Sequence, residues 1–350
     1  MTNPWLNKCV LITGVCGTVG KGLLRQLVGY QSVEIIGVDN NESELFFLDD
    51  FYRSDPRISF YLCDMRDRDR LKDRTRGIDI ILHTAAYKHV ILCEHSPWDA
   101  IQTNIVGAQN LIEAAISNGV ERVLLTSTDK AVNPTSVMGT SKLMGERLMT
   151  AANVQRRGSK PIFTSSRFGN VLGSRGSVLS IFEQQIAAGG PVTLTDRSMT
   201  RFIMTLEQAV ELMVDAVFMA WGGEVFVSKM PIARIEDLAA VMIEELAPAY
   251  GFAADQIEVK VIGTKPGEKL YEELINDEET RRVVELERHF AVLPAFQSVY
   301  EHVSYDYPDS SSKGIEQPYN SAVGKPMDRE QLRHFLLDNN QLDKEGKVAS

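Results

Sequence analysis

The chain has 350 residues, of which 44% are hydrophobic and 24% are charged, and its formal net charge is −10. This composition excludes global disorder, and the length predicts about two domains or one large α/β unit with an appended lobe. An acidic chain is a poor general binder of nucleic acid, which requires a basic face, although a local basic pocket for a small anionic substrate is compatible with it.

The cysteines and the chain start predict a reduced, cytoplasmic protein without membrane association. None of the four cysteines belongs to a Cys-x-x-Cys pair, so we expect packing thiols and no metal site. They are Cys9, Cys16, Cys63 and Cys93. Residues 1–8 lack the pattern of a signal peptide. The most apolar long window, 209–221, carries acidic residues and is too short to span a bilayer.

The first half of the chain alternates apolar runs with helix-like segments. Continuous apolar runs are typical of strands buried on both faces. We predict such strands over 8–13, 33–39, 58–63, 78–84, 122–126 and 161–168. The helices predicted between them cover 19–29, 66–76, 97–118 and 135–157. This alternation predicts an α/β fold with a parallel, doubly wound sheet of the Rossmann type.

The alternation loosens after about residue 169. Further helices are predicted over 177–188, 206–220, 235–250 and 328–337, and short strands over 224–227 and 256–262. The segment 304–325 is rich in Ser, Pro, Tyr, Gly and Asp, which predicts an extended surface arm rather than a packed element.

A glycine-rich turn follows the first predicted strand and opens the first predicted helix. Glycines there permit positive φ and a close backbone approach, and the helix N-terminus offers unpaired N–H groups to a pyrophosphate. This position in an alternating pattern predicts a dinucleotide site. The cofactor contacts expected from the turn are Gly14, Cys16, Gly17, Thr18, Val19 and Gly20.

Acidic residues end the second and third predicted strands. Asp39 is placed to accept hydrogen bonds from the adenosine ribose and to repel a 2′-phosphate, so we expect NAD, with NADP as the alternative. A turn role with the two following asparagines is the other interpretation of Asp39. Asp64 is placed to meet the adenine edge or to cap the next helix. Further expected cofactor contacts are Met65, Ala85 and Ala86.

The fifth predicted strand runs into three reactive side chains, Thr128, Asp129 and Lys130. This architecture binds ligands at the carboxyl ends of its strands, so we interpret the three residues as functional. Together with the next helix, they resemble the extended short-chain dehydrogenase/reductase superfamily, whose Tyr-x-x-x-Lys pair corresponds to Met138 and Lys142. Methionine cannot move a proton on a substrate hydroxyl, which disfavours simple dehydrogenase or 4-epimerase chemistry.

Four segments narrow the resemblance to the polysaccharide-biosynthesis branch, the UDP-N-acetylglucosamine 4,6-dehydratases, some of which carry Met at the Tyr position. They are 83–90, 127–131, 167–177 and 199–202. The resemblance implies an NAD(P)-dependent hydro-lyase that makes a UDP-4-keto-6-deoxy-N-acetylhexosamine for surface glycan or nonulosonic acid synthesis. In that reaction C-4 is oxidised, the C-5 proton is removed with loss of the C-6 hydroxyl as water, and the hydride returns to C-6.

The resemblance also implies roles for individual residues. Asp129 would be the acid at the C-6 oxygen, Lys130 the base at C-5, and Thr128 a hydrogen-bonding group near the C-4 oxygen. Lys142 would hold the nicotinamide ribose. In place of Met138, the candidates for taking the C-4 hydroxyl proton are Asp129, Thr128 or an ordered water.

The substrate contacts follow from the same resemblance. Arginine suits a nucleotide diphosphate because its fork pairs two oxygens, and Glu268, in the loop 264–269, is expected at the uridine ribose. Surface salt bridges and a plain Pro-Gly turn are the structural alternatives. The expected contacts are Lys88, Asn170, Arg175, Val178, Arg201 and Glu268.

The predicted domains are a dinucleotide-binding domain with the catalytic motifs over 1–175, a mainly substrate-binding lobe over 176–300 with segments returning to the first domain, and a C-terminal arm and helix over 301–350. The superfamily commonly pairs through helices, so a homo-oligomer is expected. A nucleotide-sugar epimerase and a non-catalytic NAD(P) sensor are the alternative functions.

Overall fold

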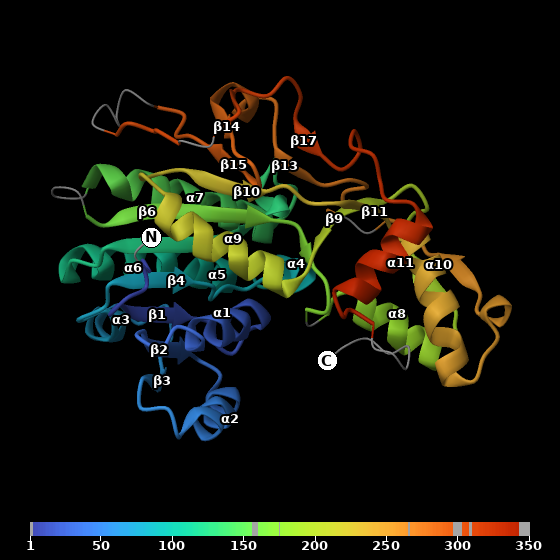
Figure 1. Ribbon diagram of the computed structural model, residues 1–350, viewed down its shortest axis with the longest axis horizontal. Helices are drawn as coiled ribbons and strands as arrows, with labels where there is room; N and C mark the ends of the chain where they lie inside the picture. Colours follow the sequence, from blue (N-terminus) through green and yellow to red (C-terminus); the bar gives the residue numbers. More distant parts are fainter. Residues whose placement is uncertain are drawn as a thin grey trace. The chain divides into compact units, whose positions relative to one another are not determined.

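The computed structural model describes residues 3–155, 160–174, 176–264, 267–296, 303–307 and 310–342. The chain divides into two compact units, which Figure 1 colours along the sequence. Unit 1 comprises Met1–Phe168, Val210–Ser228 and Asp277–Gln317. Unit 2 comprises Gly169–Ala209, Lys229–Asn276 and Pro318–Ser350.

A ten-stranded sheet forms the centre of unit 1 (Figure 1). Its parallel part has the order β3-β2-β1-β4-β5-β6-β10. The bounds are β1 Cys9–Thr13, β2 Glu34–Asp39, β3 Ile58–Leu62, β4 Ile80–His83, β5 Arg122–Thr128, β6 Ile162–Phe168 and β10 Val225–Ser228. The order reverses between β1 and β4, where doubly wound sheets bind their ligands, and the predicted Rossmann-type fold is confirmed.

Three strands extend this sheet in the antiparallel sense beyond β10, and the sequence prediction missed them. They are β15 (His289–Val292), β14 (Val283–Glu285) and β16 (Ser312–Lys313). Each is short, so its sequence offers few positions for a pattern to repeat.

Helices cover both faces of the sheet in unit 1. Ser127 donates a hydrogen bond to Glu146 on α7, whereas its neighbour Thr126 contacts Met213 on α9. Successive strand residues point to opposite faces, so α7 and α9 lie on opposite sides. The helices are α1 Thr18–Val28, α2 Glu42–Tyr52, α3 Arg68–Arg74, α4 Val90–His95, α5 Pro97–Ala100, α6 Gly107–Asn118, α7 Val137–Gln155 and α9 Leu206–Met219, whose first turn belongs to unit 2.

The predicted helix over 97–118 is interrupted. A π-helical segment, η1 (Ile101–Val106), separates α5 from α6. The sequence prediction also missed α2, because Leu45 alone is buried in it while Phe46, Phe47 and Phe51 are exposed, so no apolar face repeats along this helix.

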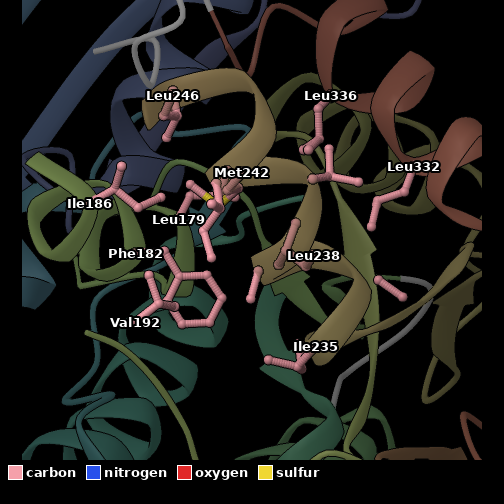
Figure 2. Packing of buried hydrophobic residues seen from close by; sticks show 14 of the residues in the cluster. Leu179, Phe182, Ile186, Val192, Ile235, Leu238, Met242, Leu246, Leu332 and Leu336 are labelled. Carbon is pink, nitrogen blue, oxygen red and sulfur yellow. The ribbon is translucent and has the colours of Figure 1, made fainter. Parts of the chain in front are cut away.

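Unit 2 is built around three helices, α8 (Val178–Ala187), α10 (Ile235–Leu246) and α11 (Arg329–Asp338). Figure 2 shows their apolar side chains meeting in one cluster. The labelled members are Leu179, Phe182, Ile186, Val192, Ile235, Leu238, Met242, Leu246, Leu332 and Leu336. Short strands complete unit 2: β7 Asn170–Val171, β8 Val192–Leu194, β9 Thr200–Met204, β11 Ile232–Arg234, β12 Val259–Val261, β13 Glu273–Ile275 and β17 Tyr319–Asn320.

The prediction of an extended surface arm over 304–325 is wrong for its described residues. In unit 1, Tyr307 is buried and its hydroxyl donates to the Glu224 carboxylate at 2.7 Å, and β16 pairs with β14. In unit 2, β17 pairs with β13, and Ser321 is fully buried with its hydroxyl 2.9 Å from that of Thr200. Polar residues enter the interior here because each finds a hydrogen-bond partner.

Candidate active site

The glycine-rich turn brings three backbone segments of unit 1 together. Gly14 has a φ of +70°, and a Cβ there would lie 2.6 Å from the backbone nitrogen of Ala85, after β4. A Cβ at Gly20 would lie 2.7 Å from the Cα of Val15. Contacts this short do not occur, so both positions require glycine, which lets these backbone segments meet at the switch point of the sheet.

Helix α1 starts at Thr18 from the N-cap Gly17, without a side-chain cap among the described residues. Its first N–H groups therefore suit an anion. Asp39, at the end of β2, accepts hydrogen bonds from the N–H groups of Cys16 and Asn41, both at 3.0 Å. The carboxylate is thus fixed in the turn. Burial and the Asp39 charge raise the pKa of Cys16 to about 12, so Cys16 remains a thiol.

The residues after β3 separate the two interpretations of Asp64. Helix α3 is capped by Asp67, whose side chain accepts from Arg70 N, so Asp64 does not cap it. Instead Asp64 pairs with Arg66 at 2.6 Å, and this hydrogen-bonded partner lowers the pKa of its carboxyl. Met65 is buried, and its carbonyl accepts from the Asn110 side chain.

The turn after β5 contains the densest group of reactive side chains. Asp129, in the 3-10 turn η2 (Asp129–Ala131), is 3% exposed. Thr128 Oγ1 donates to Asp129 Oδ1 at 2.7 Å, and Lys130 Nζ lies 2.9 Å from Asp129 Oδ2. The Lys130 side chain is 38% exposed. One buried carboxylate thus accepts hydrogen bonds from the hydroxyl and the ammonium group of its two sequence neighbours. Such an arrangement is suited to proton transfer.

Helix α7 presents Met138 and Lys142 differently. Met138 is 3% exposed and packs with Cys93 and Ala100. Lys142 is buried and its Nζ donates to the carbonyl oxygen of Thr126 at 2.5 Å. Burial lowers the pKa of Lys142 to about 8, with an opposing effect from the charge of Glu146.

Two further groups lie beside these residues. Burial, with the charge of Lys142, lowers the pKa of His83 to about 3, and the Nδ1 of this neutral ring lies 2.6 Å from Thr13 Oγ1. Asn104, in η1, bonds both the N–H and the carbonyl of Tyr87 and donates to Ser141 Oγ at 2.9 Å. Asn104 therefore links the loop after β4 to α7. A lone Asn in a helical pattern carries no sequence signal for this role.

In unit 2, Glu272 joins two of the predicted substrate residues. Its buried carboxylate accepts from Asn170 Nδ2 at 2.8 Å and pairs with Arg201 Nε at 3.2 Å. Arg201 also donates to the carbonyl oxygens of Thr200 and Lys269. Most of its donors are thus engaged within unit 2. Glu272 was missed because no motif marks it.

The remaining predicted substrate residues differ in how they are placed. Glu268 Oε2 is buried and has no hydrogen-bond partner among the described residues. Val178 opens α8 behind Ser177, whose buried Oγ likewise lacks a partner in that part of the chain. Lys88 is exposed in the loop before α4. Arg175 lies outside the described residues, as do the residues 265–266 of the predicted loop.

Comparison with known proteins gives relatives over nearly the whole chain. An uncharacterized membrane protein of Methanocaldococcus jannaschii is 44% identical over 97% of this chain and 98% of its own length. An inverting UDP-N-acetylglucosamine 4,6-dehydratase of Campylobacter jejuni is 35% identical, covering 88% and 89%. A UDP-glucose 4-epimerase of Rickettsia bellii is 33% identical, covering 99% and 100%. Within the described residues of the present chain, no helix combines the length and apolarity that a bilayer crossing requires.

Solved structures and a family model complete the comparison. The structure of Pen from Bacillus thuringiensis matches with a TM-score of 0.87 and 38% identity over 95% of this chain and 98% of its own. The dTDP-glucose 4,6-dehydratase DesIV of Streptomyces venezuelae, solved with NAD, shares the fold with a TM-score of 0.63 and 23% identity, covering 75% and 86%. The model of the polysaccharide biosynthesis protein family matches residues 10–294. With a match of that extent and relatives of that similarity, the chain belongs to the polysaccharide biosynthesis protein family.

Proposed function

We propose that the protein is a nucleotide-sugar dehydratase of polysaccharide biosynthesis. It acts on UDP-N-acetylglucosamine with NAD as its resident cofactor, and it releases water and a UDP-4-keto-6-deoxy-N-acetylhexosamine. The observation that carries the proposal is the buried Asp129 carboxylate, which accepts from Thr128 and Lys130 at the end of β5. Elimination of water needs an acid and a base side by side, and this turn supplies both.

The glycine turn of unit 1 fits a dinucleotide. A Cβ at Gly14 or Gly20 would fill the space where backbone meets backbone. The start of α1, which no side chain of the described residues caps, suits a pyrophosphate. The Asp39 carboxylate accepts from two N–H groups and keeps further lone pairs for the ribose hydroxyls, which favours NAD over NADP. Lys142 would donate to the nicotinamide ribose. Bound NAD supplies a reversible hydride acceptor for the sugar.

Asp129 and Lys130 would eliminate water as one unit. Transfer of the proton from Lys130 Nζ to Asp129 Oδ2, across 2.9 Å, converts the ion pair into an amine and a carboxylic acid. Burial of Asp129 favours these neutral forms. The amine then takes the C-5 proton while the acid protonates the departing C-6 hydroxyl, and the ion pair is restored.

The proton balance closes through Thr128. Lys130 returns a proton to C-5 once C-6 is reduced, which leaves the pair one proton short. The C-4 hydroxyl releases one proton to water at the first step, and the pair regains one from water at the end of the turnover. The Thr128 hydroxyl, 2.7 Å from Asp129, would relay the regained proton. Met138 takes no part in this relay, because its thioether is buried against Cys93 and Ala100.

Unit 2 carries the groups proposed for the nucleotide. Asn170 and Arg201, fixed by Glu272, and the start of α8 at Val178 would hold the diphosphate. The Oε2 of Glu268, which has no partner within the described part of the chain, would accept from a ribose hydroxyl. Lys88 and Arg175 remain proposed contacts to the same substrate.

The test is incubation of the purified protein with UDP-N-acetylglucosamine in D₂O. We expect a product that has lost one water, with a C-6 methyl signal in its proton NMR spectrum. In Lys130→Ala, exchange of the C-5 hydrogen should vanish while NAD stays bound. A matched control is Lys160→Ala, because Lys160 is exposed and pairs with Glu121. Turnover near the wild-type rate in Lys130→Ala would contradict the role of Lys130.

The second candidate is a nucleotide-sugar 4-epimerase, which the similarity to the R. bellii protein favours. An epimerase yields an isomer of unchanged mass and needs no Lys130. The same incubation separates the two functions, because loss of water and inversion at C-4 give different spectra.

A further inference from the structure

A buried ionic network lies beside the end of β5. Arg167, on β6, is 1% exposed and pairs with Glu146 of α7 at 2.6 Å. Its Nη1 also pairs with Glu279, in the 3-10 turn η5 (Glu279–Arg282), at 2.9 Å. The Ser127 hydroxyl donates to the same Glu146 carboxylate at 2.5 Å. All of these groups belong to unit 1.

Helix α7 holds the end of β5 at two consecutive residues. Lys142 Nζ donates to the Thr126 carbonyl, and Glu146 accepts from Ser127. Residues four apart lie on the same side of a helix, so Lys142 and Glu146 form one clamp. The clamp ends directly before Thr128, where the reactive turn begins.

The charges in this region balance when Lys142 is protonated. Glu279 also contacts Arg282 at 3.5 Å, and Arg282 pairs with the exposed Glu278 at 3.0 Å. Three carboxylates and two guanidinium groups thus leave one negative charge, which the Lys142 ammonium compensates one turn away.

The elements packed around α7 bring other titratable groups as well. His95 and Asp99 are exposed to solvent, and three others are neutral or have a partner. They are neutral His83 on β4, the Asp129–Lys130 pair, and Glu94 of α4, which accepts from Val137 N.

We propose that Glu146 is a positioning residue of the active site. Fixed by Arg167 and Ser127, its carboxylate keeps the buried Lys142 ammonium charged and in place at the end of β5. The part of this inference that concerns cofactor binding rests on the proposed function, because it requires Lys142 to contact the nicotinamide ribose. The part that concerns the charge of Lys142 does not.

The test follows the Lys142 side chain by NMR in the protein labelled with ¹³C at lysine Cε, with Lys142→Arg assigning the signal. In Glu146→Gln we expect the titration midpoint of Lys142 to fall by about one pH unit or more, because an opposite charge next to a buried amine is lost. The matched control is Glu279→Gln, which removes the other carboxylate on Arg167 but lies off α7. We expect it to shift the midpoint by less than half as much.

A merely structural network predicts a different result. Both variants would then lower the melting temperature alike and leave the Lys142 midpoint unmoved, which would overturn the proposal. If Glu146→Gln does not fold, Glu146→Asp replaces it. Its retracted carboxylate should lower the midpoint by a smaller, measurable amount, and no shift would again overturn the proposal.

NAD titrations at pH 7.5 and 6.0 separate this inference from the proposed function. Glu146→Gln should weaken NAD binding more at pH 7.5 than at pH 6.0, where Lys142 regains its proton in either protein. If the NMR midpoint shifts and NAD affinity does not follow it, the charge role of Glu146 stands and the contact between Lys142 and the cofactor fails. Absence of dehydratase activity leaves the NMR result unaffected.

Discussion

The two groups of candidate site residues are held together in different ways. In unit 1, Thr128, Asp129 and Lys130 are adjacent in the chain and bond to one another. In unit 2, Asn170 is held by Glu272, which lies 102 residues away in the sequence. A site formed by consecutive residues can be recognised in the sequence. A site formed by residues a hundred positions apart can be recognised only in the folded structure. The variants below test whether the first group carries chemistry and the second carries binding.

The largest effect is expected for Asp129→Asn. The amide cannot be protonated to an acid and accepts the Lys130 ammonium poorly, so we expect kcat to fall about a thousandfold. The KM for the nucleotide sugar and the amount of bound NAD should stay close to wild type. Steady-state rates and the absorbance of the bound cofactor measure both. A large rise in KM instead would indicate that Asp129 binds the substrate rather than transfers a proton.

The opposite pattern is expected for Glu272→Gln. Without this carboxylate, Arg201 and Asn170 lose their common partner, and we expect KM to rise about a hundredfold with little change in kcat. Glu273→Gln is the matched control, because its carboxylate is adjacent and contacts Lys269 at 3.8 Å. Equal losses of kcat in Glu272→Gln and Asp129→Asn would erase the proposed distinction between the two groups.

A third variant tests whether unit 1 has room for the superfamily's tyrosine. Met138→Tyr places a larger side chain against Cys93 and Ala100, so we expect a loss of about 2 kcal/mol of folding free energy from overpacking. We expect no gain in turnover. Urea unfolding and initial rates measure the two effects, and an unchanged stability with faster turnover would show that position 138 faces the substrate.

The effect that is smallest at neutral pH concerns His83, whose pKa is lowered by burial from 6.5 to about 3. Below pH 6.5 the unfolded chain binds a proton that the folded chain does not. The stability from this residue is therefore complete above pH 6.5 and is lost as the pH falls toward 3, by about 1.4 kcal/mol per pH unit. His83→Gln should flatten the fall in unfolding free energy between pH 6 and 4.5. Parallel curves for both proteins would show that His83 is protonated in the folded state.

The central sheet could be predicted because its strands are buried on both faces. Cys9–Thr13 and Ile80–His83 are nearly continuous apolar runs, and such runs have few other interpretations. Elements without a repeating apolar face escaped prediction. Helix α2 exposes its phenylalanines, and the hairpin of β14 and β15 gains its stability from pairing with distant strands.

The site was predictable to the extent that its chemistry is local. The turn with Thr128, Asp129 and Lys130 and the turn with Gly14 can be identified from consecutive residues. Glu272 and Asn104 could not be, because their functions consist of contacts with residues far away in the sequence. The segment 304–325 was mistaken for a surface arm because its buried hydroxyls find partners that composition does not reveal.

The π-helical segment Ile101–Val106 constrains the length of the chain at this point. A helix turns about 100° per residue, and the wider turn of η1 accommodates one residue more than regular α-geometry would. Deleting a residue here would swing Asn104 away from Tyr87, or else rotate Leu111 and Ala115 of α6 out of the core. The hydrogen bonds of Asn104 and the packing of α6 thus both depend on the number of residues in this segment. We expect the helical run from Pro97 to Asn118 to tolerate substitutions but neither insertions nor deletions.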